Sequence, residues 1–213
     1  MMENIKNKRI TLLSPFIIIF GNILSALIFG KLIGKWSFIP LIIIEWFLFL
    51  FFILKFGEES SIKNWLKKGN KNWFWIIITL IIGLIPIPIF IKHNHLLQDW
   101  SVFIPWILLA LINPWLEEFY WRGFLSDATK KWNSLLSILF TSFLFAMNHF
   151  VFGINSEIFR ENAVVISTFI MGIVWAITYK KTNSLRWVIL SHFLVDFLNL
   201  SAPAFLDLFS ARM

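Results

Sequence analysis

The chain contains no cysteine and few charged residues, and both absences narrow its chemistry. Without cysteine, none of its 213 residues can form a disulfide, a thiolate–metal bond or a cysteine nucleophile. Charged residues make up 15% of the chain, against about 25% in soluble domains, whereas 58% are hydrophobic and the mean hydropathy is +0.76. These values exclude an ordinary soluble domain. A catalytic site in this chain must rely on oxygen and imidazole groups.

Long apolar stretches predict an all-α bundle of about seven or eight membrane-spanning helices, in a single domain over residues 1–213. A helix needs about 20 mostly apolar residues to cross a bilayer. Seven stretches fit this pattern, at residues 11–30, 38–56, 73–91, 101–121, 135–153, 164–179 and 185–202. The short apolar segment 203–209 either extends the last span or lies at the interface.

Basic residues alternate between the two sides of these expected spans. One side carries 14 of the 19 Lys and Arg residues and the other carries 5. By the positive-inside rule, we expect a multi-pass protein of the cell membrane with a cytoplasmic N-terminus, and seven spans would leave the C-terminus outside. The net charge of +7 therefore indicates membrane topology and contact with lipid, not nucleic acid.

Three polar motifs interrupt the apolar runs: Glu117-Glu118-x-x-x-Arg122, Phe145-x-x-x-His149 and His192-x-x-x-Asp196. A charged group at membrane depth costs roughly 2.5–3.5 kcal/mol on insertion scales, so such groups usually face a polar cavity. A rise of about 1.5 Å per helical residue puts all three motifs roughly 10–21 Å inside the membrane. We therefore expect the three motifs to meet in one cavity.

Helical spacing suggests different roles for the two glutamates of the first motif. Glu118 and Arg122 are four residues apart and share a helix face, so Arg122 can hold Glu118 ionised. Glu117 points about 100° away and is the candidate general base. The alternative is that Glu117, Glu118 and Arg122 form an ion-paired cap where the helix reaches the membrane surface.

The two histidine motifs also allow two interpretations. His149 lies on the same helix face as Phe145, and its neutral imidazole suits accepting a proton or orienting water. A lone histidine is, however, more often a satisfied buried residue. His192 and Asp196 are four residues apart, and a structural hydrogen bond between them is an equally good account.

Other polar residues are weaker candidates. Glu45, inside the second expected span, either lines the cavity or pairs with a neighbouring helix. His93 and His95 stand in an apparent outer loop, where a solvated loop is a better account than a metal site.

The three motifs resemble those of the CPBP intramembrane proteases, also called the CAAX protease, bacteriocin-processing or Abi family. The family patterns EExxxR, FxxxH and HxxxN/D occur here in the same order and with similar spacing, over residues from about 100 to 200. The resemblance implies that Glu117 and His149 activate water and that His192 and Asp196 act on the oxyanion side. Glu118 and Arg122 would support and orient the site.

The chain departs from the CAAX-processing members at Asp196, where they typically carry Asn. An ionised carboxylate cannot donate to an oxyanion. Asp196 is therefore either protonated, or it orients His192 so that the imidazole donates. We favour the second interpretation.

The resemblance also raises the question of a metal, because older descriptions of the family call it metal-dependent. Glu117, His149 and His192 would be the ligands, and Zn is the possible ion, although the spacing is not HExxH. We favour water activation without a metal, and no other cofactor is expected.

The expected function is hydrolysis of a peptide bond in a membrane-associated peptide or protein. The small size and the richness in Ile, Lys and Asn suggest a bacterial source, which favours a peptide or membrane-protein substrate over a prenylated CAAX substrate. Two alternatives use the same polar groups without proteolysis. One is a non-enzymatic bacteriocin self-immunity or partner-binding membrane protein, and the other is a proton-coupled transporter.

Overall fold

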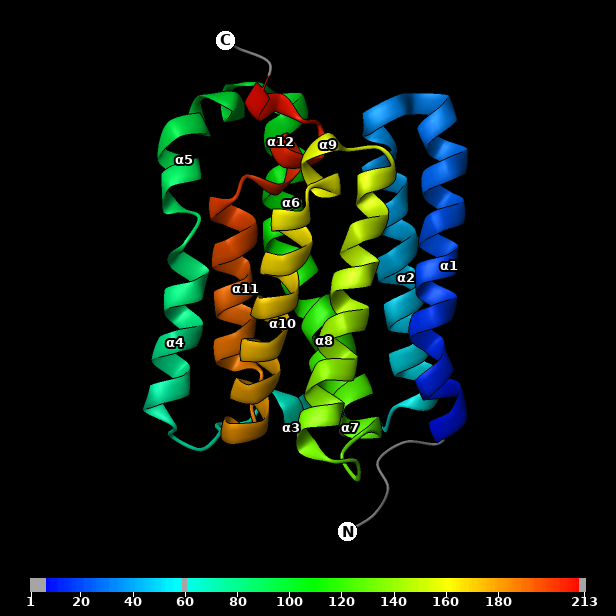
Figure 1. Ribbon diagram of the computed structural model, residues 1–213, viewed down its shortest axis with the longest axis vertical. Helices are drawn as coiled ribbons and strands as arrows, with labels where there is room; N and C mark the ends of the chain where they lie inside the picture. Colours follow the sequence, from blue (N-terminus) through cyan, green and yellow to red (C-terminus); the bar gives the residue numbers. More distant parts are fainter. Residues whose placement is uncertain (1–6, 59–60, 211–213) are drawn as a thin grey trace.

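The computed structural model describes residues 7–58 and 61–210. The expected sides of the two chain ends fall in part on residues 1–6 and 211–213, which lie outside the described residues. Within the described part, the chain forms helices joined by short turns, with no strand. Most helices run along the long axis of the molecule, and α1 begins at the end opposite the one where the last described helical turn lies (Figure 1).

The helices follow the predicted spans closely. The α-helices are α1 (Lys8–Ile33), α2 (Phe38–Phe56), α3 (Ser61–Trp65), α4 (Trp73–Leu84), α5 (Ile87–His93), α6 (Trp100–Glu118), α7 (Ser126–Ala128), α8 (Ser134–Phe150), α9 (Glu157–Arg160), α10 (Asn162–Thr182), α11 (Arg186–Leu198) and α12 (Ser201–Phe205). Short 3-10 turns η1 (Gly34–Ser37), η2 (Asn94–Gln98), η4 (Val151–Ile154) and η5 (Leu208–Ser210) join or end them, and η3 (Phe119–Leu125) is a π-helix.

Five segments of the described chain are long and apolar enough to cross a membrane: Lys8–Phe56, Trp73–Gln98, Trp100–Ala128, Ser134–Ile154 and Asn162–Thr182. The first of them folds back at η1 into the antiparallel helices α1 and α2 (Figure 1). These findings confirm the all-α membrane bundle. The expected span 185–202 differs, because α11 has 13 residues and the chain turns at Leu200, which has a φ of 55°.

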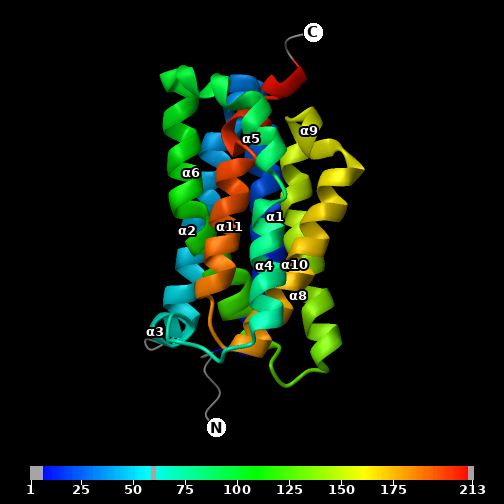
Figure 2. The same ribbon diagram turned by 90° about the vertical axis from the view of Figure 1, so that its left-hand side faces the viewer.

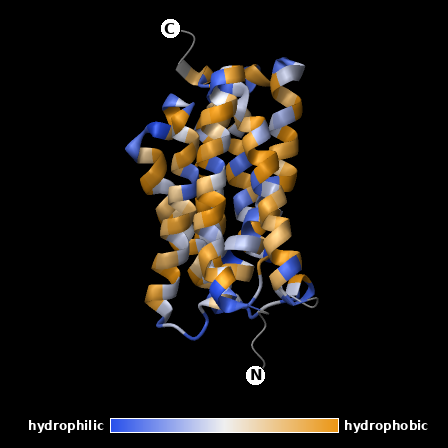
Figure 3. Ribbon diagram, turned by 90° about the vertical axis from the view of Figure 1, so that its right-hand side faces the viewer, coloured by the Kyte–Doolittle hydropathy of each residue, from blue (hydrophilic) through white to orange (hydrophobic). Residues whose placement is uncertain are grey.

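Large apolar side chains cover the outside of the bundle. Leu13, Phe20, Leu32, Phe47 and Leu54 on α1 and α2 are all exposed, which suits contact with lipid. Figure 3 shows hydrophobic residues along most of the helix shafts, with hydrophilic residues near the ends and at some positions midway along the bundle. The apolar surface that would be a liability in water is therefore the membrane-facing surface here.

Proline interrupts the apolar segment Trp73–Gln98 in the middle of the bundle. Pro86 has no backbone N–H to continue the hydrogen bonds of α4, so α4 ends at Leu84 and α5 starts at Ile87. Figure 2 shows this break between α4 and α5, in front of α11 and beside α10. Ile85 and Pro86, at this break, line the same cavity as residues of the three polar motifs.

Hydrogen bonds between buried polar side chains tie the helices together. Ser14 and Tyr120 join α1 to the π-helix at 2.6 Å, and Thr79 and Thr178 join α4 to α10 at 2.6 Å. Such pairs are typical of helix contacts in membranes, where the hydrophobic effect contributes little between helices.

Candidate active site

Glu118 is the centre of a buried charged network. Its Oε1 accepts a hydrogen bond from Arg122 Nη1 at 2.9 Å and lies 2.8 Å from His192 Nδ1. Glu118, Arg122 and His192 are 0%, 1% and 2% exposed, so the network is enclosed by the bundle. The Glu118–Arg122 pair expected from the spacing is present, and it joins α6 to α11 through His192.

A change of helix type follows the two glutamates directly. The α-helical hydrogen bonds of α6 end at Glu118, and residues Phe119–Leu125 continue as a π-helix. Single π-turns inside α-helices occur often at functional sites, because the extra residue redirects the side chains that follow. Here the π-helix carries Arg122 back towards Glu118.

Glu117 faces the two histidines. Its Oε2 lies 3.5 Å from His192 Nε2 and 3.8 Å from His149 Nε2. Within the described chain, this oxygen has no hydrogen-bond partner, although Glu117 is only 2% exposed. The structure thus brings the three motifs of α6, α8 and α11 to one point.

The backbone contact of His149 determines which of its nitrogens can accept a proton. Its Nδ1 lies 3.0 Å from the carbonyl oxygen of Phe145. A carbonyl oxygen only accepts, so Nδ1 carries the hydrogen and Nε2 has a free lone pair. That lone pair and Glu117 Oε2 are two acceptors 3.8 Å apart.

Asp196 is held by α6 and not directly by His192. Asn113 Nδ2 donates to Asp196 Oδ2 at 3.1 Å, and Trp46 Nε1 donates to Asn113 Oδ1 at 2.9 Å. The gap between Asp196 Oδ1 and His192 Nε2 is 3.7 Å, too long for a hydrogen bond. The carboxyl group within hydrogen-bond distance of His192 is therefore that of Glu118, where the sequence favoured Asp196. The sequence motifs did not identify Asn113, although Asn113 precedes Glu117 by four residues and so shares its helix face.

Aromatic rings enclose the charged groups. Trp175 stacks on His192 with centroids 4.5 Å apart, and the Arg122 guanidinium lies 4.0 Å from the centre of the Phe145 ring. Gly172 permits this packing, because a Cβ there would lie 3.2 Å from Arg122 Nη2. No motif marked Trp175 or Gly172 in the sequence.

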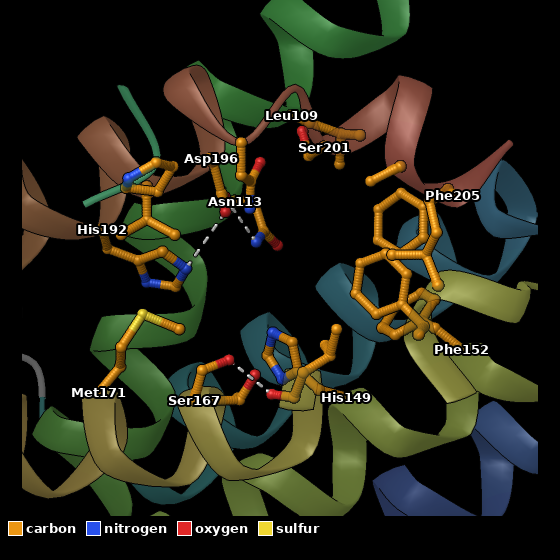
Figure 4. Close-up of a pocket in the computed structure, with 18 of the residues that line it drawn as sticks. Leu109, Asn113, His149, Phe152, Ser167, Met171, His192, Asp196, Ser201 and Phe205 are labelled. Carbon is orange, nitrogen blue, oxygen red and sulfur yellow. Dashed lines mark hydrogen bonds and ion pairs between the residues drawn. The ribbon is translucent and has the colours of Figure 1, made fainter. Parts of the chain in front are cut away.

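The site opens into a cavity of about 440 Å³. Figure 4 shows His149 and His192 facing each other across it, with Asn113 and Asp196 on one side and Phe152 and Phe205 farther along. Most of its wall is aliphatic or aromatic, with contributions from α4, α5, α6, α8, α10, α11 and α12. An apolar pocket with a few convergent polar groups is the usual form of a ligand site.

One side of the cavity reaches the lipid-facing surface. Ile85 and Ile89, at the break between α4 and α5, line the cavity and are 66% and 38% exposed. Ile170 on the neighbouring α10 also lines it and is 51% exposed. The cavity therefore has its opening between α4–α5 and α10, in the side of the bundle.

The weaker sequence candidates lie outside this cavity wall. Glu45 accepts a hydrogen bond from Asn148 Nδ2 at 2.6 Å, and Asn22 Nδ2 donates to Asn148 Oδ1 at 2.9 Å, so Glu45 pairs with a neighbouring helix. His93 packs against Phe209 with ring centroids 4.8 Å apart, and His95 is exposed. Neither histidine contributes to the site.

The arrangement of the same residues does not fit a metal ion. Among the described residues, no group of three His, Asp or Glu side chains has an arrangement that could hold a metal ion. This applies to Glu117, His149 and His192, the set that the sequence named.

The comparisons with known proteins agree with the three motifs. The curated proteins and the solved structures yielded no match. Residues 98–198 match the family described as type II CAAX prenyl endopeptidase Rce1-like, and this range contains all six site residues as well as Asn113 and Trp175. The resemblance to the CPBP proteases is thus confirmed over residues 98–198, which are similar to the Rce1-like CAAX endopeptidase family.

Proposed function

We propose that the protein is an intramembrane endopeptidase in which Glu117 and His149 activate water. The observation that carries the proposal is that Glu117 Oε2, which has no hydrogen-bond partner in the described chain, lies 3.8 Å from His149 Nε2 beside the cavity. A water molecule can donate one hydrogen to each and so present its oxygen lone pairs to a peptide carbonyl. Glu117 takes the proton as the oxygen attacks, and then delivers it to the leaving amine.

His192 is the proposed donor to the tetrahedral oxyanion. Its Nδ1 is engaged with Glu118, so its Nε2 is the atom that faces the reacting groups. Because Nδ1 faces a carboxylate, donation from Nε2 requires a hydrogen on both ring nitrogens. The carboxyl oxygens nearest the ring are those of Glu118 at 2.8 Å, Glu117 at 3.5 Å and Asp196 at 3.7 Å. A donor fixed in this way in a water-poor site stabilises developing negative charge strongly.

The supporting residues hold these groups in position. Arg122 and Glu118 neutralise each other inside the bundle, and Trp175 fixes the plane of the His192 ring. Asp196, held by Asn113, contributes negative charge near Nε2 and is not itself a donor. The reaction so described needs no metal, and zinc on Glu117, His149 and His192 is the competing hypothesis.

The proposed substrate is a peptide or protein segment that reaches the site from the membrane. The opening between α4–α5 and α10 is lined by isoleucines that face the lipid. The loops near residues 66–72, 129–133 and 183–185, which are rich in lysine or adjoin basic residues, lie at the end where α1 begins (Figure 1). We accordingly place that end in the cytoplasm and the protein in the cell membrane.

The test is a comparison of peptide termini in cells that express the wild type or Glu117→Gln at matched levels. Glutamine keeps the size of the side chain and removes the base, so termini produced by the wild type are expected to disappear in the variant. The matched control is Glu161→Gln, at an exposed glutamate outside the cavity wall. Identical termini in the wild type and Glu117→Gln overturn the proposal. A phenotype that survives in the variant would then favour an immunity or binding role, and ion flux without products would favour a transporter.

A further inference from the structure

We infer that Asn113 donates a second hydrogen bond to the tetrahedral oxyanion, beside that of His192, and is therefore a catalytic residue. This inference rests on the proposed function and adds a residue that none of the three motifs contains. It follows from the fixed orientation of the Asn113 amide, from its place beside Glu117 and Asp196, and from a comparison with other donors at the cavity.

A single donor satisfies only part of a buried oxyanion. When water attacks a peptide carbonyl, the electron pair of the C=O π bond moves to the oxygen, which then carries a negative charge and accepts several hydrogen bonds. The cavity wall is mostly apolar, and a charge in such surroundings is costly unless hydrogen bonds compensate it. His192 Nε2 is one donor in the proposed reaction, whereas ionised Asp196 and Glu117 can only accept. The reaction therefore calls for a further N–H or O–H group near His192 Nε2.

Two contacts fix which end of the Asn113 amide faces the site. The indole N–H of Trp46 can only donate, and its nitrogen lies 2.9 Å from Asn113 Oδ1. An ionised Asp196 can only accept, and its Oδ2 lies 3.1 Å from Asn113 Nδ2. The amide oxygen is therefore held towards α2 and the amide nitrogen towards α11. Nδ2 carries two hydrogens and has one acceptor in the described chain, so its second hydrogen is available to a substrate.

This second hydrogen lies beside the reacting groups. Asn113 precedes Glu117 by four residues on α6, and both residues line the cavity from one helix face. Asp196 links the two donors, because its Oδ2 accepts from Asn113 Nδ2 and its Oδ1 lies 3.7 Å from His192 Nε2. Figure 4 shows Asn113 at the edge of the open space that His149 and His192 face. An oxyanion in that space accepts from Nε2 on one side and from Nδ2 on the other, and Asn113 transfers no proton.

Two hydroxyl groups that Figure 4 places at the cavity are weaker candidates for this donor. Ser167 Oγ donates to the carbonyl oxygen of Val164 at 2.9 Å, so its hydrogen is engaged. Ser201 Oγ has no hydrogen-bond partner in the described chain, so no contact fixes the direction of its hydrogen. Donors stabilise an oxyanion most when they are oriented before the charge develops. Asn113 is held at both ends of its amide and meets this condition, and Ser201 is the rival donor.

The first experiment measures kcat and KM separately for a peptide that spans one mapped site, a bond whose cleavage in cells depends on Glu117. Asn113→Leu keeps a side chain of similar size and removes the donor, and the full-length protein is assayed in lipid vesicles. An oxyanion donor acts only in the transition state, so we expect kcat to fall about 100-fold while KM changes less than about threefold. Asn94→Leu, at an exposed asparagine, is the matched control and should keep the wild-type kcat.

A double-mutant cycle separates a donor from a residue that only positions Asp196. If Asn113 acted only through Asp196, Asn113→Leu would have no further effect once Asp196→Ala is present. A donor to the oxyanion still contributes in that background, so the double variant should have a kcat at least about tenfold below that of Asp196→Ala alone. Equal kcat values for these two variants overturn the inference.

Trp46→Phe tests the same donor with Asn113 left in place, and it decides the question if Asn113→Leu does not fold. The change removes the N–H that holds Asn113 Oδ1, so kcat should fall at least about threefold at an unchanged KM. An unchanged kcat in the folded Trp46→Phe protein overturns the inference. So does a large loss of kcat in Ser201→Ala with a wild-type kcat in Asn113→Leu, which assigns the donor to Ser201. These outcomes leave the proposed function intact, whereas an absence of Glu117-dependent cleavage overturns the proposed function itself.

Discussion

His192 Nδ1 lies 2.8 Å from Glu118 Oε1, and the same oxygen accepts the hydrogen bond of Arg122 at 2.9 Å. The contact links α11 to α6 across the interior and decides which nitrogen of His192 faces Glu117. The second glutamate of the motif is thus the partner of both a cation and a histidine, whereas Oε2 of the first has no hydrogen-bond partner in the described chain.

Removing the Glu118 carboxylate should destabilise the protein through Arg122. Glu118→Ala leaves a buried guanidinium without its ion pair, which typically costs about 3–5 kcal/mol. Thermal unfolding in detergent should show a large fall in Tm, and Glu118→Gln a smaller one because the amide oxygen still accepts. Glu161→Gln, at an exposed site, serves as the control. An unchanged Tm in Glu118→Ala would show that Arg122 finds another partner.

Asn113 should affect the reaction more than the fold. Asn113→Ala removes the donor to Asp196, a hydrogen bond to a charged group whose loss is worth about 1.5–3 kcal/mol, or roughly 10- to 100-fold in rate. We expect a fall of this size in the cleavage rate of a mapped peptide. Asn94→Ala, at an exposed asparagine near the far end of α5, is the matched control. Equal rates for Asn113→Ala and the wild type would contradict the role given to Asp196.

Two glycine-to-alanine changes should have different effects. At Gly172, a Cβ would lie 3.0 Å from Ser142 Cβ and 3.2 Å from Arg122 Nη2, so Gly172→Ala should cost about 1–3 kcal/mol by overpacking. At Gly21, the nearest atom is 3.4 Å away, so Gly21→Ala should be neutral or stabilising, since alanine favours the helix. Unfolding measurements on both variants check this difference, and equal effects would refute the packing argument.

The charge of Asp207 should make the stability of the folded protein depend on pH in the acid range. Burial raises the pKa of Asp207, but hydrogen bonds from the Ile158 N–H, Ser156, Lys35 and the Glu157 N–H outweigh it and hold the pKa below its usual value. Because the folded pKa is the lower one, the stabilisation is complete above the unfolded pKa of about 3.9 and is lost as pH falls through the folded value.

The corresponding measurement is Tm against pH for the wild type and Asp207→Asn. The variant should have a lower Tm at pH 6, and the difference should shrink below pH 4, because protonation removes the charge from the wild type as well. A difference that stays constant down to acid pH would mean that the Asp207 charge is not what stabilises the C-terminal segment.

Chelation should leave cleavage intact. The proposed reaction uses water held by Glu117 and His149, so dialysis against a strong zinc chelator should not change the rate for a mapped peptide. Loss of activity that added zinc restores would instead support the competing zinc hypothesis.

Much of the architecture was readable from the chain because membrane helices follow local rules. Each apolar run must satisfy its own backbone hydrogen bonds, so the helices near residues 8–56, 73–98, 100–128, 134–154 and 162–182 follow from hydrophobicity alone. The i,i+4 spacing likewise predicted the Glu118–Arg122 pair, which depends on one continuous stretch of helix. The protease family could be read from the same motifs.

Contacts between separate helices were decided only by the tertiary structure. No local rule shows that His192 meets Glu118 across 74 positions, that Asn113 holds Asp196, or that Trp175 stacks on His192. The break at Pro86 could be expected from proline, but its place in a cavity wall depends on the packing of α10 and α11. Hydrophobicity and spacing act within a helix and determined the spans and motifs, whereas the partners of each polar group depend on which helix faces meet.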